Sequence, residues 1–213
     1  MKQQSIAFGH RDLTLDGILS IPTNRATPFP GVVLCHPHTL FGGSMSSPVM
    51  QALSSALDIR GLATLRFNFR GVGLSGGTFD QGKGEQDDLK LAIDTLKRWP
   101  GVRGDRIGIA GVSFGAVVAL DCIAKLRNIK AIAALSPTLS GVRRSKLYQF
   151  KWPKLVVVGE KDLLVPAKLL QDAVNLMTTT VDYRIIPGAD HTWGGYENLL
   201  ADQSGDFLAE ALR

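Results

Sequence analysis

One pentapeptide, Gly111-Val112-Ser113-Phe114-Gly115, places the strongest constraint on how this chain folds. The apolar run before it (106–110) has the composition of a buried strand, and the run after it (116–126) has that of a helix. The serine therefore stands at a tight turn between a strand and a helix. Such a turn strains the backbone of the serine and crowds the residues two positions away, and Gly111 and Gly115 are small enough for those positions.

This pattern is typical of a nucleophile elbow, a turn that lifts a serine hydroxyl clear of the edge of a sheet. The helix that begins at the turn directs its N-terminal N–H groups, and the positive end of its dipole, toward any anion that forms beside Ser113. The sequence therefore predicts that Ser113 is a nucleophile.

A serine hydroxyl is a poor nucleophile at neutral pH unless a base takes its proton and an acid orients that base. His191 follows Ser113 in the chain and lies on a glycine-containing loop after the last expected strand, so we predict it as the base. The acid is expected after the preceding strand, where Glu160 and Asp162 both occur. We prefer Asp162 because it stands farther beyond the strand end, with Glu160 as the alternative. Asp190 is expected to be a turn or surface acid, because neighbouring side chains on a loop usually diverge.

Negative charge on a carbonyl oxygen beside the serine would need two N–H donors. The backbone N–H of Phe114, directly after the nucleophile, is predicted as the first donor. The second donor is expected in the loop after Cys35, where Leu40 and His38 are both candidates and Leu40 is preferred. The side chains of His38 and Phe41 are predicted to contact substrate.

Histidines and glycines at strand ends can also indicate a metal site or a dinucleotide-binding loop. His36 and His38 could bind a metal ion, but no further His-Asp-His cluster follows, so no metal is expected. Gly71, Gly73 and Gly76 have the spacing of a dinucleotide-binding loop. No helix can begin within that motif, so a tight turn is the better interpretation, and no cofactor is expected.

Arg70, which precedes the glycines, is predicted to be structural and to pair with a nearby acid such as Asp87.

Along the whole chain, runs of strand composition alternate with runs of helical periodicity. Strands are expected at 5–10, 12–21, 31–35, 63–69, 106–110, 129–135, 154–159 and 182–186. Helices are expected at 48–60, 85–99, 116–126, 165–177 and 198–212, and residues 136–152 are expected to be irregular. This alternation predicts an α/β fold with a doubly wound, mostly parallel sheet, formed by residues 1–213 as a single domain.

Composition narrows the function classes further. The chain has 213 residues, 45% of them hydrophobic, and a net charge of +5. Its Lys and Arg residues are scattered, with Arg143, Arg144 and Lys146 as the densest group, so no nucleic-acid partner is expected. No apolar stretch is long enough to span a membrane, and no signal-peptide pattern is recognised, so we expect a cytoplasmic protein without a membrane partner. Cys35 and Cys122 are expected to be reduced core thiols.

The chain resembles serine hydrolases of the α/β-hydrolase superfamily, in particular small lidless bacterial proteins near the dienelactone hydrolases and small carboxylesterases. The resemblance covers the whole chain, and its markers are residues 36–43, 66–75, 111–115, 159–162 and 188–191. Many relatives have His-Gly where this chain has His36-Pro37, and proline has no N–H to donate. Dienelactone hydrolases often have a cysteine nucleophile where this chain has Ser113, so their substrate is not carried over.

The resemblance implies hydrolysis of a carboxylic ester or thioester of a small substrate, through an acyl-enzyme on Ser113. Residues 136–152 are too few for the helical cap that many relatives insert, so an open site is expected. Arg143, Arg144 and Lys146 could line its rim, although a solvated basic loop is the simpler interpretation. The alternatives are acyl transfer or peptide hydrolysis by the same residues, or a binding protein that keeps the fold without turnover. We expect a monomer or a weak homodimer.

Overall fold

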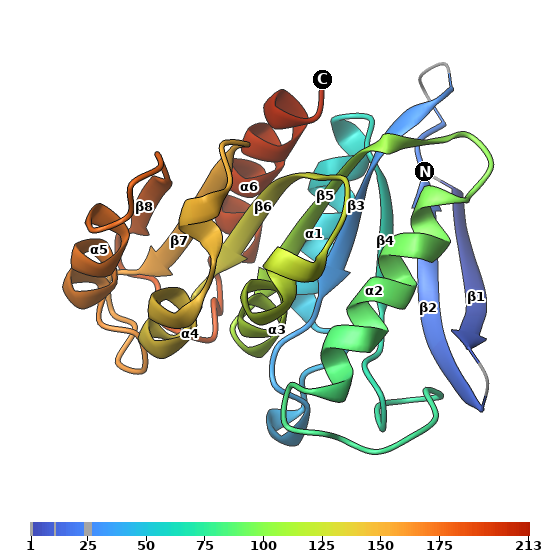
Figure 1. The fold of residues 1–213 in the computed structure, drawn as a ribbon, viewed down its shortest axis with the longest axis horizontal. Coiled ribbons are helices and arrows are strands. Elements are labelled where there is room, and N and C mark those ends of the chain that lie inside the picture. The colour runs from blue at the N-terminus through green and yellow to red at the C-terminus, as the bar shows by residue number, and fades with distance from the viewer. Residues whose placement is uncertain (1, 11, 24–26) are drawn as a thin grey trace.

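The computed structural model describes residues 2–10, 12–23 and 27–213, and its centre is one sheet of eight strands. The order across the sheet is β1-β2-β4-β3-β5-β6-β7-β8, and it runs from right to left in Figure 1. The strands are β1 (Lys2–His10), β2 (Leu13–Ile21), β3 (Phe29–Cys35), β4 (Ala63–Phe67), β5 (Val102–Val112), β6 (Ile129–Leu135), β7 (Lys154–Gly159) and β8 (Asp182–Ile186). In this order, each strand from β4 through β3 to β8 pairs in parallel with the next. β2 pairs antiparallel with both β1 and β4.

Helices connect the parallel strands and cover both faces of the sheet (Figure 1). They are α1 (Pro48–Ile59), α2 (Gly84–Lys97), α3 (Phe114–Cys122), α4 (Leu139–Arg144), α5 (Ala167–Asn175) and α6 (Glu197–Ala211), with short 3₁₀ turns η1 (Thr39–Phe41), η2 (Ile123–Lys125) and η3 (Leu147–Gln149).

The two faces follow from the alternation of side chains along each strand. In β3, Val33 and Cys35 join the core beneath α2, α3, α4 and α5, whereas Val32 and Leu34 join the core beneath α1 and α6. All four side chains are fully buried. Strands with helices on both faces have no polar face, which is why their sequences are continuous apolar runs.

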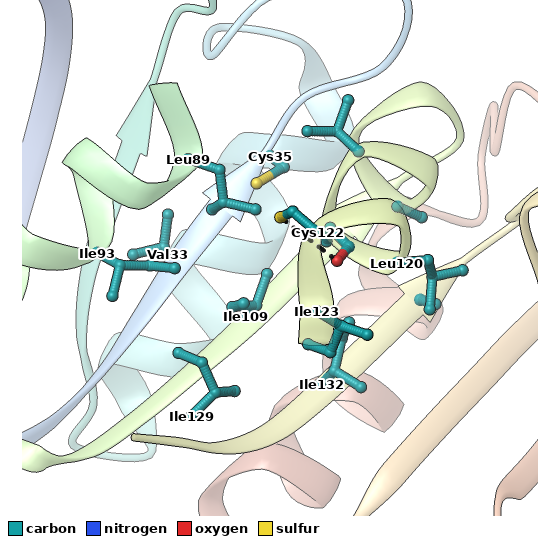
Figure 2. Close-up of a cluster of buried hydrophobic side chains, with 14 of the residues drawn as sticks. Val33, Cys35, Leu89, Ile93, Ile109, Leu120, Cys122, Ile123, Ile129 and Ile132 are labelled. Carbon is teal, nitrogen blue, oxygen red and sulfur yellow. Dashed lines mark hydrogen bonds between the residues drawn. The ribbon is translucent and has the colours of Figure 1, made fainter. Parts of the chain in front are cut away.

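The first core contains both cysteines of the chain. Figure 2 shows Cys35 at the end of β3 and Cys122 at the end of α3 with their sulfur atoms pointing toward one another. Both thiols are free and fully buried. Burial raises the pKa of Cys35 well above its ordinary value and that of Cys122 to about 12. Both are therefore protonated at neutral pH, in agreement with the prediction of reduced core thiols.

The predicted fold class is confirmed, and most element boundaries agree within a few residues. Asp16 and Gly17 lie inside β2, which runs without interruption through them. The strand before the elbow is longer than predicted and begins at Val102. The expected helix over 116–126 ends at Cys122 and continues as η2. The expected turn at residue 11 and part of the loop over 22–30 lie outside the described residues.

The prediction that residues 136–152 are irregular was wrong, because they contain α4 and η3. Thr138 starts α4 by accepting a hydrogen bond from the N–H of Gly141 (3.2 Å). Arg144, near the end of that helix, makes two 2.7 Å hydrogen bonds to Asp121 of α3. These two short elements fill the connection between β6 and β7, which therefore carries no cap domain.

The parallel strands all end at one edge of the sheet, and this arrangement positions the candidate site. The loops after β3, β4, β5, β6, β7 and β8 meet there, and every residue predicted for the site lies on one of them or at the start of α3. Within the described residues, no helix has the length and apolar character needed to cross a membrane.

We predict that the two thiols resist modification in the folded protein, because they are buried and protonated. Ellman's reagent at neutral pH should label neither thiol in the native state and both in denaturant. In a Cys122→Ala variant, one thiol should react with the reagent after unfolding. Rapid labelling of the native protein would contradict the packing in Figure 2.

Candidate functional site

Ser113 lies between β5 and α3 in a strained backbone conformation, with φ 50° and ψ −111°. Its N–H donates to the carbonyl oxygen of Leu135 (2.7 Å), and its carbonyl accepts the N–H of Val117 (3.1 Å) as α3 begins. The turn is crowded on both sides. A Cβ atom on Gly111 would lie 2.6 Å from the N of Ala116, so only glycine fits that position.

The hydroxyl of Ser113 faces a histidine and a carboxylate in series. Ser113 Oγ lies 2.8 Å from His191 Nε2, and His191 Nδ1 lies 2.8 Å from Asp162 Oδ2. The carboxylate fixes the ring so that Nδ1–H donates to it and Nε2 accepts the serine proton. The three residues predicted from the sequence are therefore brought together in one hydrogen-bonded chain.

Asp162 is held by several further donors. Its Oδ1 accepts the N–H groups of Leu164 (3.0 Å) and Val165 (2.8 Å), and its Oδ2 also accepts the hydroxyl of Ser136 (3.0 Å). Burial by itself raises the pKa of Asp162, but the hydrogen bonds from His191, Val165 and Ser136 outweigh burial and leave the pKa below its usual value. The carboxylate is thus ionised opposite the histidine.

Ser136 is a site residue that sequence reasoning missed. It is fully buried directly after β6, its backbone has a φ of 45°, and its N–H donates to the carbonyl of Val157 (2.8 Å). The one signal in the sequence is its position, as the first residue beyond the strand that neighbours the elbow strand. No motif marks that position.

The two acids that compete with Asp162 in the sequence have other roles. Glu160 Oε2 accepts the N–H of Gly188 (2.9 Å) and so braces the loop that carries His191. Asp190 Oδ1 accepts both the N–H and the hydroxyl of Thr192, at 2.8 and 2.7 Å, as expected for a turn acid. Neither carboxylate is hydrogen-bonded to His191.

His36 is built into the fold rather than exposed for chemistry. It is fully buried, its Nδ1 donates to the carbonyl of Pro37 (2.6 Å), and its Nε2 accepts the N–H of Phe69 (3.1 Å). This pattern requires the neutral ring. Burial, with a smaller contribution from His38, lowers the pKa of His36 to about 4. His36 therefore ties the loop after β3 to the loop after β4.

The two candidates for the second N–H donor differ in their environment. The N–H of Leu40 donates to His38 Nδ1 (3.2 Å) and caps η1, so it already has a partner. The ring of His38 packs beside the elbow, with its centroid 4.8 Å from that of Phe114. The N–H of Leu40, which the sequence favoured, is already paired, and the N–H of His38 is the other candidate. Phe41 is almost fully exposed beside His38.

Two polar side chains of the β4 region hold the far end of this loop through Met45. The carbonyl of Met45 accepts Arg66 Nη1 (2.9 Å), and its N–H donates to Asn68 Oδ1 (2.9 Å). Both side chains are buried, and burial lowers the pKa of Arg66. Asn68 Nδ2 also donates to Asp16 Oδ2 (3.2 Å).

Arg70 is structural, as predicted, but its partner is Asp88 and not Asp87. Its Nη2 lies 2.7 Å from Asp88 Oδ1, and its backbone N–H donates to Oδ2 of the same carboxylate (3.0 Å). Asp87 pairs with Lys90 on the exposed side of α2 instead. Adjacent residues of an α-helix point about 100° apart, so Asp88 can face Arg70 while Asp87 faces Lys90.

In the described part of the chain, no three His, Cys, Asp or Glu side chains are grouped closely enough to hold a metal ion. Ser113, His191 and Asp162 lie together beside the N–H of Phe114. Because Phe114 is the first residue of α3, its N–H precedes the first hydrogen bond inside that helix. This arrangement can deprotonate a serine and stabilise an adjacent oxyanion.

Comparison with known proteins identifies the family of the chain. Residues 31–205 match the family model described as an alpha/beta hydrolase domain. The uncharacterized protein RP471 of Rickettsia prowazekii is 34% identical over 174 residues, which cover 76% of this chain and 71% of that protein.

Solved structures show the same similarity. An alpha-beta serine hydrolase homologue from Coxiella burnetii has a TM-score of 0.83 and 30% identity, and covers 100% of this chain and 99% of its own. XC6422 from Xanthomonas campestris, described as an a/b serine hydrolase without lid, has a TM-score of 0.82 and 28% identity over 96% and 93% of the two chains. The chain belongs to the alpha/beta hydrolase family, and its class is that of the hydrolases. Within the family it is of the lidless type.

We predict that His36 makes the fold sensitive to acid. Unfolded chains protonate a histidine below about pH 6.5, whereas the folded protein resists protonation of His36 until about pH 4. Between these values the unfolded state binds more protons, so the free energy of unfolding should fall by up to about 1.4 kcal/mol per pH unit as the pH drops.

Urea unfolding at a series of pH values measures this slope. A His36→Gln variant should be less stable at pH 7 but show a shallower slope, because the titrating group is gone. His10→Gln, which changes an exposed histidine on β1, is the control and should keep the wild-type slope. An unchanged slope in His36→Gln would rule out His36 as the source.

Proposed function

We propose that this protein is a serine hydrolase that cleaves a carboxylic ester or thioester of a small substrate through an acyl-enzyme. The observation that carries the proposal is the chain of hydrogen bonds from Ser113 Oγ to His191 Nε2 and from His191 Nδ1 to Asp162 Oδ2, each 2.8 Å long. The strained backbone at Ser113 supports it, because strain of this kind persists where a function requires it.

In the first half of the reaction, Ser113 Oγ attacks the substrate carbonyl carbon while its proton moves to His191 Nε2. Asp162 stabilises the resulting imidazolium through the Nδ1–H hydrogen bond. The tetrahedral oxyanion accepts hydrogen bonds from the N–H of Phe114 and, in this proposal, from the N–H of His38. His191 then gives the proton to the leaving alcohol or thiol, and the bond to the leaving group breaks.

In the second half, a water molecule takes the place of the leaving group. The oxygen of this water attacks the acyl carbon while His191 Nε2 removes a proton from the water. His191 then returns that proton to Ser113 Oγ as the bond between Oγ and the acyl carbon breaks and the acid is released. The open connection between β6 and β7 supports small or partly solvated substrates, since α4 and η3 do not form a lid.

A fluorophosphonate probe tests the proposal directly, because it reacts with serines that a neighbouring base activates. The intact mass of the wild-type protein should show one adduct. Ser113→Ala should show none, and His191→Ala should react at least about a hundredfold more slowly, because general-base catalysis contributes about that much. Absence of an adduct on folded wild-type protein would refute the proposal.

We also predict a measurable role for Ser136 as a positioning residue. Ser136→Ala removes a hydrogen bond to a charged carboxylate, and kcat/KM for an ester should fall about three- to tenfold. With one donor fewer, Asp162 is a stronger base and stabilises the imidazolium more, so the acid limb of the pH–rate profile should move to higher pH.

Ser140→Ala, an exposed serine of the same connection, is the matched control and should leave both readouts at wild-type values. If Ser136→Ala changed protein stability but left the pH profile in place, its role would be structural only.

A further inference from the structure

Four aromatic rings form a continuous wall beside Ser113, here called the aromatic wall: His38, Phe41, Phe79 and Phe114. The His38 ring lies 4.8 Å from that of Phe114 and 5.2 Å from those of Phe41 and Phe79, measured between centroids. The rings of Phe79 and Phe114 are 5.6 Å apart. The wall extends from the residue directly after the nucleophile to Phe41, which is 88% exposed.

The fold places this wall on one side of the nucleophile only. His38 and Phe41 follow β3 and Phe79 follows β4, and both strands lie on the same side of β5 in the sheet. The loops that carry Asp162 and His191 follow β7 and β8, on the opposite side of β5. The aromatic wall and the acid–base pair thus face each other across Ser113.

The wall is held in place by the protein interior. The buried carboxylate of Glu85 accepts the N–H groups of Asp80 and Gly82, both at 2.8 Å, and so fixes the loop that carries Phe79. The fully buried ring of Phe69 supports Phe114 edge-on, with centroids 5.8 Å apart.

The His38 ring is oriented by the hydrogen bond from the N–H of Leu40 to its Nδ1. A surface whose side chains are already ordered loses little conformational entropy when a ligand binds to it.

The direction of proton transfer decides which part of a substrate meets this wall. In the proposed reaction the leaving-group oxygen or sulfur must lie near His191 Nε2, because that atom protonates it. The acyl substituent then points away from His191, toward the side occupied by His38, Phe79 and Phe114.

From this we infer that the protein prefers esters or thioesters whose acyl group carries an aromatic ring. The inference rests on the proposed function. Aromatic pairs at centroid distances of about 4.5–7 Å have an interaction energy beyond that of the apolar area they bury. The kcat/KM for a substrate with a phenyl ring should therefore exceed that for one with a saturated ring of the same size by about two- to tenfold.

The test compares two para-nitrophenyl esters with the same leaving group, phenylpropanoate and cyclohexylpropanoate. Both rings are separated from the carbonyl by two methylene groups, so the intrinsic reactivity of the two esters is matched. The wild-type ratio of kcat/KM should favour the phenyl ester at least about twofold. Phe41→Leu and Phe79→Leu, which keep an apolar side chain but remove the ring, should each lower this ratio toward one.

Leu163→Ala serves as the control, because it alters an exposed apolar side chain on the Asp162 loop, across Ser113 from the wall. Its phenyl-to-cyclohexyl ratio should equal that of the wild type. A ratio that stays at the wild-type value in both Phe41→Leu and Phe79→Leu would overturn the assignment to the aromatic wall.

Hydrolysis of para-nitrophenyl acetate separates the two proposals. Acetate hydrolysis that depends on Ser113, together with a wild-type ratio near one, overturns this inference and leaves the proposed function standing. No acetate hydrolysis and no fluorophosphonate adduct overturn both.

Discussion

The close approach of Gly115 to the end of β3 is the contact on which the site depends. A Cβ atom at Gly115 would lie 2.3 Å from the carbonyl oxygen of Cys35 and 2.6 Å from that of His36, so the first turn of α3 packs directly on the backbone of the neighbouring strand end. This contact brings the loop after β3 against the turn that carries Ser113. Ser113 and the backbone N–H groups beside it are therefore parts of one packed unit.

Buried polar groups maintain that unit, because loops at a sheet edge have backbone groups that the sheet does not pair. His36, Arg66 and Asn68 hydrogen-bond to the backbone of the loops after β3 and β4. Ser136 donates instead to the side-chain carboxylate of Asp162. Each of these side chains gives a loop group the hydrogen-bond partner that water would supply if the group were exposed. These loops consequently have defined hydrogen-bond partners outside the sheet.

The sequence predicted the fold and the Ser113, His191 and Asp162 set because each depends on local patterns and chain order, which a sequence displays directly. It did not reveal Ser136, or the choice of Asp88 over Asp87 by Arg70, because these depend on which side chains meet across strands far apart in the chain. The sequence also did not reveal that the ring of His38 accepts the N–H of Leu40, because this contact depends on the local turn of the loop. α4 was missed because six residues are too few to display a helical period.

The order of strands in the sheet has a consequence for how such a protein can diversify. Asp162 and His191 come from the loops after β7 and β8, whereas the aromatic side chains of the wall come mainly from the loops after β3 and β4, and β5 stands between the two groups. The loop over residues 78–83 is held by Glu85, at the start of the helix α2 that follows it. Among the described residues, this loop makes no hydrogen bond to Asp162 or His191. Substitutions in this loop can therefore change the aromatic surface without removing any hydrogen bond that joins Ser113, His191 and Asp162.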